Sequence, residues 1–180
     1  MKKIFEYIPL LFVVFLVAAC GQKKNEYDPY ALGDTSNKKQ VETTAFEVDF
    51  KKTDTNLKTV HVKLNDANGY DALLDTGCSS MLISSLELVE LIKSGTITKD
   101  DYVGDAPISI ADGTQSKHPM YKIREVKIVD KKGKPHSVRD IIATVIDNPG
   151  ADVLIGSAVI DNLAKKSYTI DLKKKVVRFE

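Results

Sequence analysis

The stretch that most constrains this chain runs from Leu73 to Ser84 and reads LLDTGCSSMLIS. Apolar residues at both ends predict buried strands, and the polar residues Asp75, Thr76 and Gly77 between them predict a tight turn. Glycine at such a position lets another backbone segment come close or takes a positive φ. The pattern therefore predicts a carboxylate held on a turn at the end of a buried strand.

The chain from residue 45 onward alternates short apolar stretches with turn residues. We expect roughly nine short strands and two short helices, without the alternating strand and helix pattern of a parallel sheet. One helix should be capped by Ser84 or Ser85 and end at Gly95, and the other should be capped by Ser157. Lys99–Tyr102 is expected to be a solvated turn. The fold class predicted from these signals is all-β, closed or barrel-like.

Residues 1–19 have the pattern of a signal peptide. The chain begins MKK, and its apolar run from Ile8 to Ala19 is too short for a permanent membrane-spanning helix. The following VAAC, which ends at Cys20, resembles a bacterial lipobox. That resemblance implies cleavage before Cys20 and lipidation of this residue. We therefore expect a lipoprotein of the bacterial cell envelope, with Gly21 favouring the outer membrane and periplasm over the inner membrane.

Residues 20–44 contain too little apolar material to offset the entropy cost of ordering, so we expect a flexible tether. Three segments result: a signal peptide over residues 1–19, the lipidated cysteine and tether over residues 20–44, and one domain over residues 45–180. Residues 1–19 carry two Lys and one Glu, and without them the 26 basic and 25 acidic side chains of the whole chain balance to a formal charge of zero. This balance argues against a nucleic-acid-binding protein, which needs a net basic surface.

The motif and its surroundings resemble the retropepsin-like (retroviral-type) aspartic protease family, most of all its bacterial single-domain members. Asp75-Thr76-Gly77 matches the active-site loop of that family, and Ala111-Asp112-Gly113-Thr114 falls where the tip of its flap hairpin should lie. Leu154-Ile155-Gly156 matches the second apolar-Gly element, and Ser157–Lys165 the helix after it. The four features occur in the family's order over about residues 45–180. A helical insert between Ser80 and Asp112 and a cysteine at position 78, where alanine is usual, depart from the viral pattern.

The resemblance implies an aspartic endopeptidase that needs no cofactor and no metal. Asp75 would be the catalytic residue, Thr76 and Gly77 would support the loop, and the hairpin around Asp112 and Gly113 would close over an extended peptide. Because Leu154-Ile155-Gly156 carries no second carboxylate, the partner of Asp75 would be the same residue of a second copy. The partners implied are thus a second copy, a peptide or protein substrate and, through Cys20, a membrane. The C-terminal strand over residues 176–179 is the candidate for the dimer sheet.

Several simpler interpretations compete with this one. Asp-Thr-Gly can be ordinary turn chemistry, and the same fold could serve as a catalytically silent module for peptide binding or envelope assembly. Cys78 could be a nucleophile, but no feature of the sequence pairs it with a histidine base, so a small buried thiol is the better interpretation. The three histidines show no metal-ligand spacing. The lysine runs at residues 131–132 and 173–175 are expected to be solvated turns.

Overall fold

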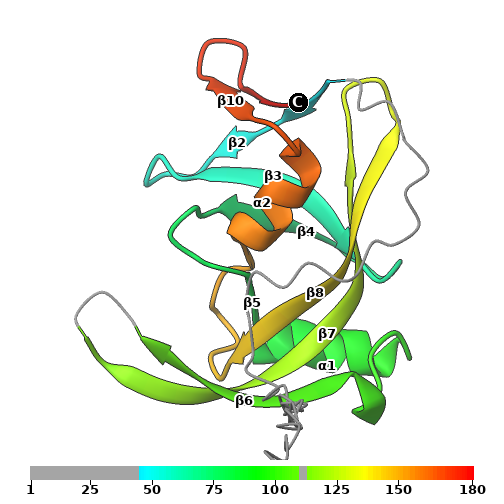
Figure 1. The fold of residues 1–180 in the computed structure, drawn as a ribbon, viewed down its shortest axis with the longest axis vertical. Coiled ribbons are helices and arrows are strands. Elements are labelled where there is room, and N and C mark those ends of the chain that lie inside the picture. Colours follow the sequence, from blue (N-terminus) through cyan, green and yellow to red (C-terminus); the bar gives the residue numbers. More distant parts are fainter. Residues whose placement is uncertain (1–44, 110–112) are drawn as a thin grey trace, which may run out of the picture.

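A computed structural model describes residues 45–109 and 113–180 (Figure 1). The predicted signal peptide, the tether with Cys20, and Asp112 at the expected hairpin tip lie outside the described residues. No helix within the described ranges is long and apolar enough to cross a membrane.

Eleven strands, two α-helices and one short 3-10 helix make up the described part of the chain. Their bounds are β1 Phe46–Asp49, β2 Lys51–Lys52, β3 Lys58–Leu64, β4 Gly69–Leu74, β5 Met81–Ser84, α1 Ser85–Lys93, η1 Lys99–Asp101, β6 Tyr102–Ser109, β7 Gln115–Val129, β8 Pro135–Ile146, β9 Leu154–Ile155, α2 Ser157–Ala164, β10 Tyr168–Asp171 and β11 Val176–Phe179. This confirms the prediction of a mainly β domain with two short helices. The strand count exceeds the expected nine because very short pairings, such as β2, give little sequence signal.

Most of the strands belong to one sheet of eight, in the order β2-β3-β4-β9-β5-β8-β7-β6. An additional pairing of β3 with β7 joins the six strands from β3 to β7 in a ring of pairings, which gives the domain its barrel-like core. Two pairings are parallel, β4 with β9 and β5 with β8. The sequence signals are those of hairpins and do not indicate these two parallel pairs.

The remaining three strands form a small sheet in the order β1-β11-β10. This sheet lies at the top of Figure 1, beside the C-terminus. β11 pairs with β1 on one side and with β10 on the other, so both of its edges are occupied within the chain. The role of residues 176–179 in a dimer sheet stays a prediction, and β11 would be an inner strand of such a sheet. A partner that extended this sheet would have to add to β1 or β10.

The core follows the alternation expected of strands with one buried face. In β3, Val60, Val62 and Leu64 are buried, while His61 and Lys63 between them face solvent. Full burial of each such aliphatic side chain contributes about 1.5–3 kcal/mol. The same alternation fixes the register, because a slip of one residue would turn these side chains outward.

α1 begins and ends as the sequence predicts. Ser84 is the N-cap: its hydroxyl accepts a hydrogen bond from the amide of Leu86 at 3.1 Å, and the carboxylate of Glu87 accepts one from the amide of Ser84 at 2.7 Å. Gly95 follows the helix with a positive φ of 71°, which glycine adopts without strain. The segment Lys99–Tyr102, which we expected to be a solvated turn, differs from that prediction. It contains the short helix η1, and Asp101 within it is only 3% exposed.

Candidate active site

Asp75 is the first residue after β4, and the end of β9 fixes its position. β4 and β9 run parallel, with Leu73 opposite Leu154 and Leu74 opposite Ile155. The amide of Asp75 donates a hydrogen bond to the carbonyl of Ile155 at 3.1 Å. The Asp75 side chain is half-buried. The sequence signal for a carboxylate at the end of a buried strand thus matches the position that the structure gives it.

The turn is held by hydrogen bonds within itself. The Oδ1 atom of Asp75 accepts a hydrogen bond from the amide of Gly77 at 2.9 Å, and the carbonyl of Asp75 accepts one from the amide of Cys78 at 3.1 Å. These two bonds orient the carboxylate relative to its own backbone. Thr76, at the tip, is exposed, and its carbonyl accepts a weak bond from the hydroxyl of Ser157 at 3.4 Å.

The start of α2 locks the second half of the loop. The amides of Gly156, Ser157 and Ala158 donate to the carbonyls of Ser80, Cys78 and Ser79 at 2.8, 2.9 and 3.0 Å. The first amides of a helix lack partners inside the helix, and here the loop carbonyls satisfy them. The N-cap is Gly156, without a side-chain bond, so the expected capping by Ser157 is wrong. The loop backbone takes the place of a capping hydroxyl.

Gly156 is required at this junction by its size. A Cβ atom on Gly156 would lie 2.2 Å from the carbonyl oxygen of Cys78 and 2.4 Å from that of Ser80. Gly77 has more room, since its Cβ would lie 3.2 Å from Oδ1 of Asp75. The structure therefore brings together the two predicted elements, Asp75-Thr76-Gly77 and Leu154-Ile155-Gly156, which are about eighty residues apart in the sequence.

β9 sits between β4 and β5, the two strands that the loop connects. Leu154 pairs with Leu73 on one side and with Leu82 on the other. The hydroxyl of Ser80, which is buried, also donates to the carbonyl of Ile142 in β8 at 2.5 Å. This last contact was missed in the sequence analysis, because nothing local connects Ser80 to a residue 62 positions away. The loop is thus anchored to β8, β9 and α2.

Cys78 is half-buried beside the carboxylate. Burial raises the pKa of its thiol, and the nearby negative charge of Asp75 raises it further, while a hydrogen bond from the backbone of Ser80 acts in the opposite direction. A raised pKa leaves little thiolate at neutral pH, which is the opposite of what a nucleophilic cysteine needs.

The three histidines contact groups elsewhere. His61 bonds Asp71 at 2.9 Å, His118 contacts the carbonyl of Val145 at 3.2 Å, and His136 bonds Asp130 at 2.9 Å. Within the described part of the chain, no cluster of three or more His, Cys, Asp or Glu side chains could hold a metal ion.

The predicted flap corresponds to a hairpin. β6 and β7 pair antiparallel from Tyr102 opposite Tyr121 to Ser109 opposite Gln115. Gly113 is exposed and has a φ of 85°, as a residue at a hairpin tip can. The free end of this hairpin and the loop between β4 and β5 project toward the same side in the view of Figure 1.

Comparison with known proteins agrees with this arrangement. Residues 60–159 match the aspartyl protease family, which is more than half of the chain. The chain therefore belongs to the aspartyl protease family, as its motifs indicate. No curated protein sequence matches it.

The solved structures that are similar to the chain include the following three. A retropepsin-like aspartic protease from Rickettsia conorii has 14% sequence identity and a TM-score of 0.48, over 75% of this chain and 90% of that one. Basic 7S globulin from soybean has 14% identity and a TM-score of 0.45, over 82% of this chain and 45% of that one. The retroviral protease-like domain of Ddi1 from Leishmania major has 17% identity and a TM-score of 0.40, over 67% of this chain and 86% of that one.

Proposed function

We propose that this protein is an aspartic endopeptidase in which Asp75 acts with Asp75 of a second copy. The observation that carries the proposal is the half-buried carboxylate on a turn fixed by β9 and α2, in a chain of the aspartyl protease family. Peptide hydrolysis by carboxylates needs one ionised group to activate a water and one protonated group to donate to the carbonyl oxygen. Two carboxyl groups about 3 Å apart meet this need, because they share one proton.

The second carboxylate has to come from outside this chain's own loop. Gly156 is level with Asp75 in the parallel pair of β4 and β9, and Ile155 precedes it, so no carboxylate stands at the matching point. Asp152 precedes β9 by two residues and lies about 13 Å back along the strand direction, at about 3.3 Å per residue. A two-fold axis beside Asp75 would supply the missing group from the same residue of a partner.

The remaining loop residues then have definite roles. The hydroxyl of Thr76, at the exposed tip, would brace the two loops against each other, and Gly77 would let them approach. The hairpin of β6 and β7 would pair with the backbone of an extended peptide and exclude water from it. The substrate is thus a peptide or a protein segment in extended conformation.

We also propose that the protein works at a bacterial membrane surface. The lipobox-like VAAC sequence that ends at Cys20 supports lipidation, and the polar residues 20–44 would let the domain stand away from the membrane. Confinement to one surface raises the local concentration of copies and so favours the dimer.

The test is cleavage of an unbiased peptide mixture by residues 21–180, followed by mass spectrometry from acidic to neutral pH and at several enzyme concentrations. We expect cleavage that rises faster than linearly with enzyme concentration and disappears in Asp75→Asn. Asp152→Asn is the matched control and should keep its activity, since it changes a carboxylate at the other end of β9.

The competing function, a peptide-binding module that does not cleave, makes the opposite prediction. A folded and dimeric protein without cleavage at any concentration, whose peptide binding is unchanged by Asp75→Asn, would support that module and overturn the peptidase.

A further inference from the structure

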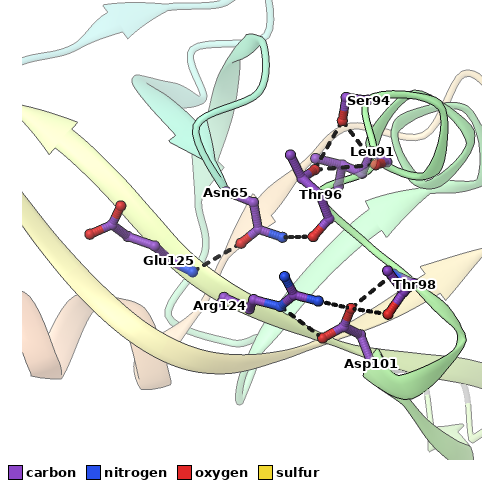
Figure 2. Close-up of polar contacts among 8 residues, drawn as sticks. All are labelled: Asn65, Leu91, Ser94, Thr96, Thr98, Asp101, Arg124 and Glu125. Atoms are coloured by element: carbon purple, nitrogen blue, oxygen red, sulfur yellow. Dashed lines mark hydrogen bonds and ion pairs between the residues drawn. The ribbon is translucent and has the colours of Figure 1, made fainter.

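Asp101 carries a buried charge directly before β6, the first strand of the hairpin. Its side chain is only 4% exposed. It forms a bidentate ion pair with Arg124 of β7, with Nε to Oδ1 at 3.0 Å and Nη2 to Oδ2 at 2.6 Å (Figure 2). The amide and hydroxyl of Thr98 also donate to Oδ2, at 2.8 and 3.1 Å. Arg124 holds the pKa of Asp101 below its usual range, so the pair stays charged. Bidentate pairs of this kind fix geometry as well as contributing energy.

A second link joins the same two segments beside the ion pair. The side-chain amide of Asn65 donates to the carbonyl of Thr96 at 3.1 Å, and its oxygen accepts from the amide of Glu125 at 3.0 Å (Figure 2). The backbone amide of Asn65 also donates a hydrogen bond to the backbone carbonyl of Glu125 at 2.8 Å. The segment from Thr96 to Asp101 is thus attached to β7 at the neighbouring residues Arg124 and Glu125.

The strand that follows, β6, pairs regularly with β7 from Gly104 to Ser109 but not at its start. β6 is an edge of the eight-stranded sheet, and β7 is its one neighbour there. Their ladder is irregular between Tyr102 and Gly104, and Gly104 has a φ of 123°. Such an irregularity bends a strand and interrupts its hydrogen bonds. At the root of the hairpin, the polar links to β7 therefore reinforce a strand pairing that is irregular there.

We propose that Asp101 and Arg124 are positioning residues for proteolysis: they fix the direction in which the β6–β7 hairpin leaves the sheet, and so its height above the peptide bound at Asp75. This inference rests on the proposed function. The ion pair is at the root of the hairpin and touches no reacting atom. The hairpin would contact the peptide backbone equally in the ground state and in the transition state, so a misplaced hairpin raises KM and leaves kcat nearly unchanged.

The test compares full-length protein in detergent with Arg124→Gln, Arg124→Lys and the double variant Asp101→Asn/Arg124→Gln. The double variant leaves no unpaired buried charge, so it provides the comparison if Arg124→Gln does not fold. Arg139→Gln is the matched control, because Arg139 lies on the adjacent strand β8 and its pair with Glu125, at 3.6 Å, is exposed on the arginine side. Hydrogen exchange of β6 and β11 amides and peptide kinetics are measured on each protein.

We expect hydrogen exchange in Gly104–Ser109 to become about tenfold faster in Arg124→Gln, because this variant loses hydrogen bonds between charged groups. KM should rise by about the same factor. Arg124→Lys keeps the charge but loses the fork, so it should fall in between. Exchange in β11 and all properties of Arg139→Gln should stay at wild-type values.

Equal acceleration in β6 and β11 would overturn the proposal, because it would mean that the pair supports only global stability. Unchanged KM despite faster exchange in β6 would also overturn it. If the wild-type protein binds peptides without cleaving them, the proposed function fails, and the Kd of the bound peptide takes the place of KM in the same comparison. The exchange measurement needs no catalysis, so the two failures are distinguishable.

Discussion

At the scale of single residues, Asp75 and Cys78 of the loop interact electrostatically. Its thiol lies close enough to Asp75 for the carboxylate charge to raise its pKa, in addition to the effect of burial. The thiol is therefore also a probe of whether the neighbouring carboxyl group is ionised.

We predict slow alkylation of Cys78 at pH 7–8, because a raised pKa keeps the reactive thiolate scarce. Asp75→Asn removes the negative charge and should lower the pKa of Cys78, so alkylation at pH 8 should become faster. The measurement is the rate of reaction with iodoacetamide as a function of pH, with Asp71→Asn as the control, since Asp71 pairs with Lys51 and His61 and not with the loop. Identical pH profiles for wild type and Asp75→Asn would show that the two side chains do not interact.

At the scale of elements, β9, α2 and the loop around Asp75 meet at a point where there is room for backbone only. The carbonyls of Cys78 and Ser80 crowd Gly156 from the loop side, and the helix amides bond to the same loop. Three elements are thus packed through main-chain contacts, which a side chain would separate.

We predict that Gly156→Ala destabilises the domain by about 3 kcal/mol, at the upper end of the usual cost of overpacking, because the added Cβ would lie within 2.4 Å of two carbonyl oxygens. Gly150→Ala is the control: its Cβ would lie 3.6 Å from Oδ1 of Asn148, an ordinary contact. Urea unfolding of both variants gives the two free energies. Equal stability of the variants would mean that the loop yields without cost, and that its backbone is not held as described.

For the whole molecule, stability should depend on pH through buried carboxylates that link distant segments. Asp130 is 8% exposed and bonds His136, and that histidine stacks on Phe46 of β1 with ring centroids 3.6 Å apart. The nearby Lys131 donates its amide to the carbonyl of Glu47, also in β1. The turn between β7 and β8 thereby connects the large sheet to the small one.

We predict that the free energy of unfolding falls in acid. The pKa values of Asp130 and Asp101 are lowered in the folded protein, by His136 and by Arg124 respectively. A carboxylate with a lowered pKa stabilises the fold above its unfolded pKa of about 3.9, and this contribution is lost as pH falls toward the folded value. Unfolding should thus become easier below about pH 4, and Asp130→Asn should show a flatter dependence there. Asp54→Asn, in an exposed turn, should keep the wild-type slope, and a wild-type stability that stays constant down to pH 2 would contradict the prediction.

Local patterns in the sequence determined where the turns, the cap of α1 and the hairpins form. The turn at Asp75, the cap at Ser84 and the hairpin ending near Gly113 each depend on residues a few positions apart, so their signals survive in the sequence. The resemblance of Asp75-Thr76-Gly77 and Leu154-Ile155-Gly156 to one family also depended on local motifs.

Only the tertiary structure decided which distant segments meet. The insertion of β9 between β4 and β5, the central place of β11 and the burial of Asp101 against Arg124 all join residues far apart in the chain. Nothing in the residues around Asp101 distinguishes it from a solvated acid, because its burial depends on an arginine 23 positions later. Such pairings are selected by the packing of the whole domain. For that reason the position of the hairpin root, unlike the turn at Asp75, had to come from the structure.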